Sequence, residues 1–125
     1  MTATIHNLDL RLTKPPLNLN DRMHWAQRAK ITKDIRLRAR IAAQVAKLPK
    51  GAESVKVRIV YRPRDKRRRD PSNLMLTQKP ALDGLVDYGL IPDDSPEYVE
   101  EVMPTIAQPI KGQPGKVWLE VTIND

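Results

Sequence analysis

Six cations gather in the eight residues from Arg62 to Arg69, and the run ends on the acid Asp70. Each arginine presents a planar fork of N–H donors that matches two phosphate oxygens, so the run predicts phosphate binding. Positive charge beside a carboxyl group keeps that group ionised. An ionised carboxylate next to a bound phosphate suits Mg²⁺, which takes oxygen ligands and shares them with substrate phosphates. The cations are Arg62, Arg64, Lys66, Arg67, Arg68 and Arg69.

Two simpler interpretations of this segment stay open. A run of like charge can be merely solvated, although this one follows a predicted strand that holds its charges in place. Asp70 can act only as a turn or cap residue before Pro71. If phosphate binding holds, the chain should bind a nucleic acid backbone in a salt-dependent way.

Two more acids and one lysine complete the candidate chemistry. Asp93 and Asp94 lie in a proline-flanked turn, where they are either solvated or able to complete a metal site with Asp70. Lys79 is the only lysine or arginine between residues 70 and 101. Its ammonium group can stabilise charge on a transferring phosphate, or form a salt bridge to Asp83 four residues later. The candidate metal ligands are therefore Asp70, Asp93 and Asp94.

Other side chains carry weaker signals. His6 and His24 are too isolated to indicate a metal site or a general base. Trp25 stands beside a basic helix, where we expect it in the core; stacking on a base is the alternative. The chain has no Cys, which excludes disulfides, Cys-based zinc sites and cysteine nucleophiles.

The pattern along the chain predicts the elements that position these residues. Thr4–Leu12 alternates as a strand, and a helix follows from a cap at Asn20 or Asp21 to about Lys47. Apolar residues on this helix fall on two adjoining stripes. One holds Ile31, Ile35 and Ala42, and the other holds Leu37, Ile41, Val45 and Leu48.

The second half predicts one more helix and three strands. Residues 55–61 alternate as a buried strand. A helix is expected from about Gln78, capped by Thr77, to a left-handed stop at Gly89. Strands at Tyr98–Met103 and Val117–Ile123 should be joined by a wide hairpin loop. The order β-α-β-α-β-β predicts one α/β (α+β) domain over residues 1–125, with a mixed sheet of about four strands and two main helices packed on it.

Charge is divided unevenly along these 125 residues. The formal net charge is +7, but residues 1–69 carry +14 and residues 70–125 carry −7. Such a division indicates contact with a polyanion, although opposite charged faces also simply keep a domain in solution. No apolar run approaches the length of a membrane span, so we expect a soluble, intracellular protein.

The candidate residues resemble those of a known family. The segment Arg67-Arg68-Arg69-Asp70-Pro71-Ser72-Asn73-Leu74, then Lys79, Asp83-Gly84-Leu85-Val86-Asp87 and Asp93-Asp94, is similar to the RusA family of phage-type Holliday junction resolvases, the crossover junction endodeoxyribonucleases. The early Pro15-Pro16-Leu17-Asn18-Leu19-Asn20 segment after a strand also fits. The resemblance covers nearly the whole chain, with its specific part between Arg67 and Asp94.

The resemblance implies a small homodimeric α/β endonuclease of recombination and repair that nicks four-way DNA junctions symmetrically with Mg²⁺. It implies the cytoplasm of a bacterial or phage-infected cell, and no membrane. Carried over, the catalytic residues are Asp70, Lys79 and Asp94. Ser72 stands where the family pattern has a second carboxylate. A hydroxyl is a weaker Mg²⁺ ligand, and water, Asn73 or Asp93 would have to fill the gap.

Two other functions stay open. One is a branched-DNA-binding protein with weakened or lost catalysis, because Ser72 replaces a carboxylate. The other is a structural domain whose basic face pairs with its own acidic face in an oligomer, for which DNA binding would be absent even at low salt.

Overall fold

A computed structural model describes residues 3–19 and 22–124. Its long strands form where apolar and polar residues alternate along the sequence. The elements are β1 (Ala3–Leu12), α1 (Trp25–Val45), β2 (Ser54–Arg62), η1 (Pro71–Leu74), α2 (Met75–Tyr88), β3 (Val99–Glu101), β4 (Thr105–Ile106) and β5 (Lys116–Asn124). The sheet order is β1-β5-β2-β3, with β4 also beside β2. β5 runs antiparallel to both β1 and β2.

One short edge of the sheet differs from the expected pattern. The strand expected at Tyr98–Met103 is shorter, as β3, and β4 is a further short strand that begins after Pro104, beyond the expected end. Both pair parallel with β2. Proline has no N–H for the ladder, which explains the break between β3 and β4. The expected hairpin with the last strand is wrong, because β5 lies on the other side of β2. The mixed sheet therefore has five strands where about four were expected.

Helix α1 begins later than expected. His24 is its N-cap, and its Nδ1 accepts a hydrogen bond of 3.2 Å from the Ala26 N–H. A cap at Asn20 or Asp21 is therefore wrong for this helix, and those two residues lie outside the described part of the chain. The buried stripe is Ile35, Ala39 and Ala43. Of the second expected stripe, only Leu48 is buried, while Leu37, Ile41 and Val45 are exposed.

Helix α2 begins earlier than expected, at Met75 and not at Gln78. Asp70 caps the 3-10 turn η1, and the chain passes from η1 straight into α2 without a second cap. Pro80 consequently lies inside the helix, where it cannot donate to the Leu76 carbonyl. The expected stop is confirmed, since Gly89 has φ 97° and donates to the Leu85 and Val86 carbonyls.

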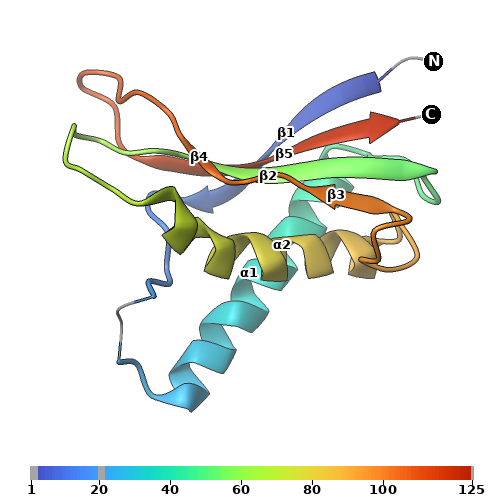
Figure 1. Ribbon diagram of the computed structural model, residues 1–125, viewed down its shortest axis with the longest axis horizontal. Helices are drawn as coiled ribbons and strands as arrows, with labels where there is room; N and C mark the ends of the chain where they lie inside the picture. The colour runs from blue at the N-terminus through green and yellow to red at the C-terminus, as the bar shows by residue number, and fades with distance from the viewer. Residues whose placement is uncertain (1–2, 20–21, 125) are drawn as a thin grey trace.

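Both helices cover the same face of the sheet (Figure 1). They cross closely at Gly84, where an added Cβ would lie 2.2 Å from the Arg36 carbonyl oxygen and 2.8 Å from the Ala39 Cβ. The first part of α1 projects beyond α2 and the sheet in this view. The chain is thus a single α+β domain of two layers, as expected. Neither helix in the described residues is both long and apolar enough to cross a membrane.

Candidate nucleic-acid interface

The segment Arg62–Arg69, called the arginine loop below, is folded around its one acid. The Asp65 carboxylate accepts from Arg69 Nη2 at 2.7 Å, from Arg67 Nε at 3.0 Å and from the Arg67 backbone N–H at 3.2 Å. These hydrogen bonds, first from the Arg67 side chain and then from Arg69, hold the pKa of Asp65 well below its usual range. Asp65 thus remains a carboxylate that gives the loop a fixed shape.

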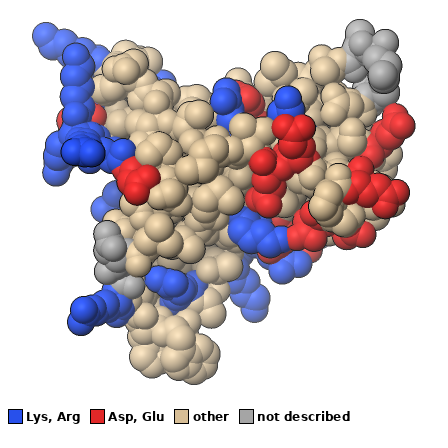
Figure 2. Space-filling model, viewed as in Figure 1, with Lys and Arg blue, Asp and Glu red and all other residues tan. Residues whose placement is uncertain are grey.

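Arg69 is used mainly for structure. Its Nη1 donates to the Arg67 and Asp65 carbonyls at 2.7 and 3.0 Å, and its guanidinium lies 5.7 Å from the centre of the Tyr61 ring. Within the described residues, by contrast, Arg64, Lys66 and Arg68 form no ion pair. Figure 2 shows blue side chains gathered along the left side, where Figure 1 draws this loop. Arg62, the last residue of β2, also forms no ion pair among the described residues, but it is half-buried and its Nε lies in the interior without a hydrogen-bond partner. Three of the six predicted phosphate-binding cations, Arg64, Lys66 and Arg68, are therefore available at the surface.

Asp70 follows the arginine loop and caps the 3-10 turn η1. Its Oδ1 accepts from the Ser72 backbone N–H at 3.0 Å, which makes it the cap of η1. This bond, together with one to the Ser72 side chain, lowers the pKa of Asp70. The cap interpretation of Asp70 is confirmed, and the capping bond also keeps the carboxylate ionised. Ser72 therefore contacts the Asp70 carboxylate. It stands at the position where the RusA pattern has a second carboxylate.

A pocket of about 330 Å³ lies beside Asp70. The segment after β1 closes one side of it, and the Leu19 backbone N–H donates to Asn73 Oδ1 at 3.2 Å, which ties this segment to η1. The sequence did not identify three polar residues of this pocket as site residues, although the Pro-Pro-Leu-Asn run pointed to the segment that closes it. They are Lys14, Asn18 and Tyr61; Arg68, Arg69, Asp70 and Asn73 also line the pocket.

Lys79 lies on the exposed side of α2 and contacts two acids. Its Nζ pairs with Asp94, and it lies 3.3 Å from Asp83 Oδ1. The expected salt bridge to Asp83 is confirmed, and the pairing with Asp94 brings the loop after α2 back along the helix. Asp93 is held differently: the Ser95 side chain and backbone N–H donate to it, and these bonds lower the pKa of Asp93. Asp94 and Lys79 are thus brought together.

Gln78, which the sequence reasoning passed over, sets the position of Lys79. Its side chain is fully buried, accepts from the Ile59 N–H at 2.8 Å and donates to the Val102 carbonyl at 3.0 Å. These two backbone groups lie at the gap between β3 and β4, where the ladder provides no partner. The signal in the sequence is that the Gln78 amide stands among apolar residues of α2, where a buried polar group needs hydrogen-bond partners. By locking α2 to the sheet, Gln78 turns the adjacent Lys79 outward.

The acids fit a magnesium site only in part. Over residues 3–19 and 22–124, no three His, Cys, Asp or Glu side chains are close enough to hold a metal ion. Asp94 is paired with Lys79, and Asp93 is bound within its own turn. Mg²⁺ is commonly bound by one or two carboxylates together with substrate phosphates and water. Asp70, ionised and beside a pocket with Arg68, fits as one ligand of such a set.

A second basic surface runs along α1. It forms a hollow of about 700 Å³ that includes Lys30, Lys33, Arg36 and Arg40, here called the basic face of α1. Arg36 is bound to Asp87 of α2 by two hydrogen bonds of 2.5 and 2.7 Å, and this contact lowers the pKa of Asp87. In the described structure the other three cations form no ion pair.

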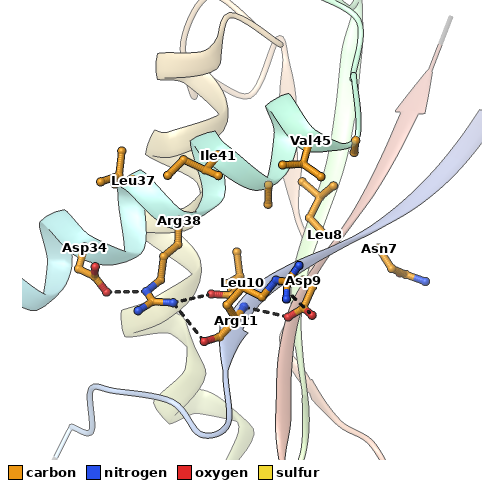
Figure 3. Close-up of a pocket in the computed structure, with 12 residues that line it drawn as sticks. Asn7, Leu8, Asp9, Leu10, Arg11, Asp34, Leu37, Arg38, Ile41 and Val45 are labelled. Atoms are coloured by element: carbon orange, nitrogen blue, oxygen red, sulfur yellow. Dashed lines mark hydrogen bonds and ion pairs between the residues drawn. The ribbon is translucent and has the colours of Figure 1, made fainter.

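A third hollow is apolar. It has a volume of about 530 Å³ and lies between β1 and the C-terminal half of α1 (Figure 3). Arg38 spans it, donating to the Leu10 and Arg11 carbonyls at 3.2 and 3.1 Å. Leu37, Ile41 and Val45 line it while remaining 50%, 48% and 73% exposed. An exposed stripe of this kind typically marks a contact surface.

Trp25 is not in the core, contrary to expectation. It is 76% exposed, the most exposed of the large apolar residues described. It is the first residue of α1, on the part of the helix that projects from the body (Figure 1).

Comparison with protein families and with curated proteins gives no relative. No protein-family model matches the chain, and a search of curated proteins finds no match. The resemblance to the RusA family therefore rests on the residues of this chain alone.

Proposed function

We propose that this chain is a Mg²⁺-dependent, structure-specific DNA endonuclease that resolves four-way junctions by paired symmetric nicks, as its resemblance to the RusA family implies. One observation carries the proposal: the ionised carboxylate of Asp70 lies beside a pocket that Arg68, Arg69 and Lys14 also line. That combination suits a phosphodiester, because cations bind its oxygens while the carboxylate supplies a metal ligand. We place this activity in recombination and repair, in the cytoplasm of a bacterial or phage-infected cell.

Each residue has a distinct task in this proposal. Arg64, Lys66 and Arg68 hold the DNA backbone, and the Asp65 cluster keeps their loop in a fixed shape. Asp70 would provide a carboxylate oxygen for the metal together with substrate phosphate and water. Asp94 and Asp93, which in this structure are bound to Lys79 and Ser95, would join it only after leaving those partners. A bound Mg²⁺ would polarise the scissile phosphate and acidify a water molecule. Lys79, which contacts Asp94, stabilises negative charge on the phosphate.

Paired nicks need two such sites, and one chain has one. A two-fold homodimer supplies both and matches the symmetry of the junction. We place the partner copy on the apolar hollow lined by Leu37, Ile41 and Val45, where each exposed side chain would leave water. An Ile41→Lys variant should be monomeric in light scattering, whereas Ile110→Lys, at an exposed site elsewhere, should stay dimeric. A monomeric wild type would refute this arrangement.

The decisive experiment is cleavage of a synthetic four-way junction with and without Mg²⁺. Wild type should give paired nicks only with the metal. Asp70→Asn should lower the rate by about 100-fold or more, on the scale of one lost charged stabilising group. Asparagine still caps a helix well, so the fold of η1 should survive. Glu97→Gln, the same loss of charge at another exposed site, is the control. Full activity in Asp70→Asn would overturn the assignment of the site.

The alternative is a branched-DNA-binding protein with weakened or lost catalysis. It is favoured by Ser72 and by the lack of a group of three metal-binding side chains among the described residues. Ser72→Asp distinguishes the two functions, since it places a second carboxylate next to Asp70. If wild type binds junctions without cutting them and the variant cuts, the natural protein has lost catalysis. If wild type cuts with Mg²⁺, the alternative fails.

A further inference from the structure

Trp25 has a position that neither packing nor capping explains. Its side chain is 76% exposed, whereas the N-cap function belongs to His24. The His24 ring is fixed by its hydrogen bond to the Ala26 N–H, and its centre lies 5.6 Å from the indole with a tilt of 31°. The indole therefore lies exposed at the N-terminal end of α1, beside the fixed ring of His24.

The charges of α1 indicate what the indole faces. Eleven residues make three helical turns, so Trp25 shares a face of α1 with Arg36. Lys33 and Arg40 lie within about 90° of that face, at about 12 and 22 Å along the axis. These residues belong to the basic face of α1, and the two acids that line the same hollow are already paired, Asp87 with Arg36 and Asp34 with Arg38. An anionic chain lying along this face would therefore pass close to the indole.

We propose that Trp25 stacks on an unpaired or unstacked DNA base while the basic face of α1 holds the adjoining backbone. A cationic groove combined with an aromatic platform is the arrangement by which proteins hold unpaired nucleic acid strands. Inside an intact duplex both faces of every base are covered by stacking, but the branch point of a four-way junction offers bases whose stacking is interrupted. The idea rests on the proposed function for its substrate and extends it with a residue that distinguishes branched from linear DNA.

The fluorescence of Trp25 tests this directly. The chain has two tryptophans, so Trp118→Phe leaves Trp25 as the only reporter. The protein is titrated in EDTA, which prevents cleavage, with a four-way junction and with a linear duplex of the same sequence. We expect the junction to quench Trp25 emission strongly and the duplex to quench it weakly. Equal quenching by both would overturn the proposal.

Affinity provides a second and independent measurement. Trp25→Leu keeps an apolar side chain and all charges but removes the ring, so junction affinity should fall by about 5- to 100-fold with an unchanged salt dependence. Trp25→Tyr should retain most of the affinity. Ile110→Ala removes another exposed apolar side chain and should bind like wild type. Unchanged affinity in Trp25→Leu would refute stacking.

The outcomes separate this inference from the proposed function. Quenching and the affinity loss without cleavage in any metal would support stacking and refute the nuclease. Cleavage with no effect of Trp25→Leu would do the reverse. A tryptophan beside lysines and arginines also suits a membrane surface. A blue shift with phosphatidylserine vesicles, with no response to the junction, would therefore overturn the assignment to DNA.

Discussion

The arginine loop and the basic face of α1 are both rich in cations, yet they hold their charge in different ways. In the loop, Asp65 binds two guanidinium groups and gives a short irregular segment its shape. On α1 the helix itself sets the spacing, and of the four cations of its basic face Arg36 is the one with an ion pair among the described residues, to Asp87 of α2. The loop is therefore suited to orienting a phosphate, and the helix to holding a length of backbone. The density of charge in a sequence does not reveal which of its cations are free.

The largest effect should come from separating the basic face of α1 from the rest of the domain. Gly84→Ala places a Cβ 2.2 Å from the Arg36 carbonyl, so α1 and α2 must move apart. We expect the free energy of unfolding to fall by about 3 kcal/mol, measured by urea denaturation. Gly51→Ala meets no neighbouring atom but has φ 71°, and should cost about 1 kcal/mol. Equal losses in both variants would contradict a close helix crossing.

The next effect concerns the shape of the arginine loop. In Asp65→Ala, Arg67 and Arg69 lose their common acceptor while the net charge rises by one. Junction cleavage should fall by about tenfold, as when a group that orients a site is removed, and low-salt DNA binding should not weaken. Glu53→Ala makes the same change of charge at an exposed site elsewhere. If both variants cleave like wild type, the loop does not need its internal anchor.

A smaller effect, the salt dependence of DNA affinity, should distinguish the basic face of α1 from the arginine loop. Replacing Lys30, Lys33 and Arg40 with glutamine should reduce the slope of log affinity against log salt by about 3, since each lost phosphate contact contributes about 0.9. The cleavage rate of bound junction should not change. The same triple replacement of Arg64, Lys66 and Arg68 should lower both the slope and the rate. Identical behaviour of the two triple variants would remove the distinction.

The smallest effect is a difference in titration. The pKa values of Asp65 and Asp87 are both lowered by arginine hydrogen bonds, but Asp65 binds two arginines and Asp87 one. A lowered folded-state pKa contributes stability above the unfolded value of about 3.9, and this is lost as pH falls through the folded value. Carboxyl NMR should therefore show Asp87 protonating before Asp65 on acidification. The reverse order would mean that the loop is the weaker cluster.

Much of the fold was predictable from local patterns. Alternation placed β1, β2 and β5, and Gly89 marked the end of α2 because a residue without Cβ readily adopts a positive φ. The start of α2 is not predictable from Pro80, because proline favours the first turn of a helix and so predicts a start near Gln78. In the structure Asp70 and η1 start the helical segment earlier. The gap between β3 and β4 was not predictable from local patterns. The backbone groups that the ladder leaves unpaired there bind the Gln78 side chain, which comes from α2.

The candidate site was predictable in its residue types and not in its contacts. The sequence indicated Asp70, Lys79 and Asp94, and their roles in catalysis stay predictions. It did not indicate that Asp94 pairs with Lys79 or that Asp70 shares a pocket with Lys14, since these contacts join segments far apart in the chain.

The sequence by itself determined which segments form the long strands and the two helices and where charge accumulates, because side-chain periodicity, proline and glycine act over a few residues. Only the tertiary structure decided which apolar and charged side chains remain available. Leu37 and Ile35 look alike along the helix, but α1 turns only Ile35 toward the sheet and leaves Leu37 in water. Trp25 is exposed for the same reason, since α1 extends past the layer that would have covered it. Burial depends on which surfaces meet, and distant parts of the chain determine that.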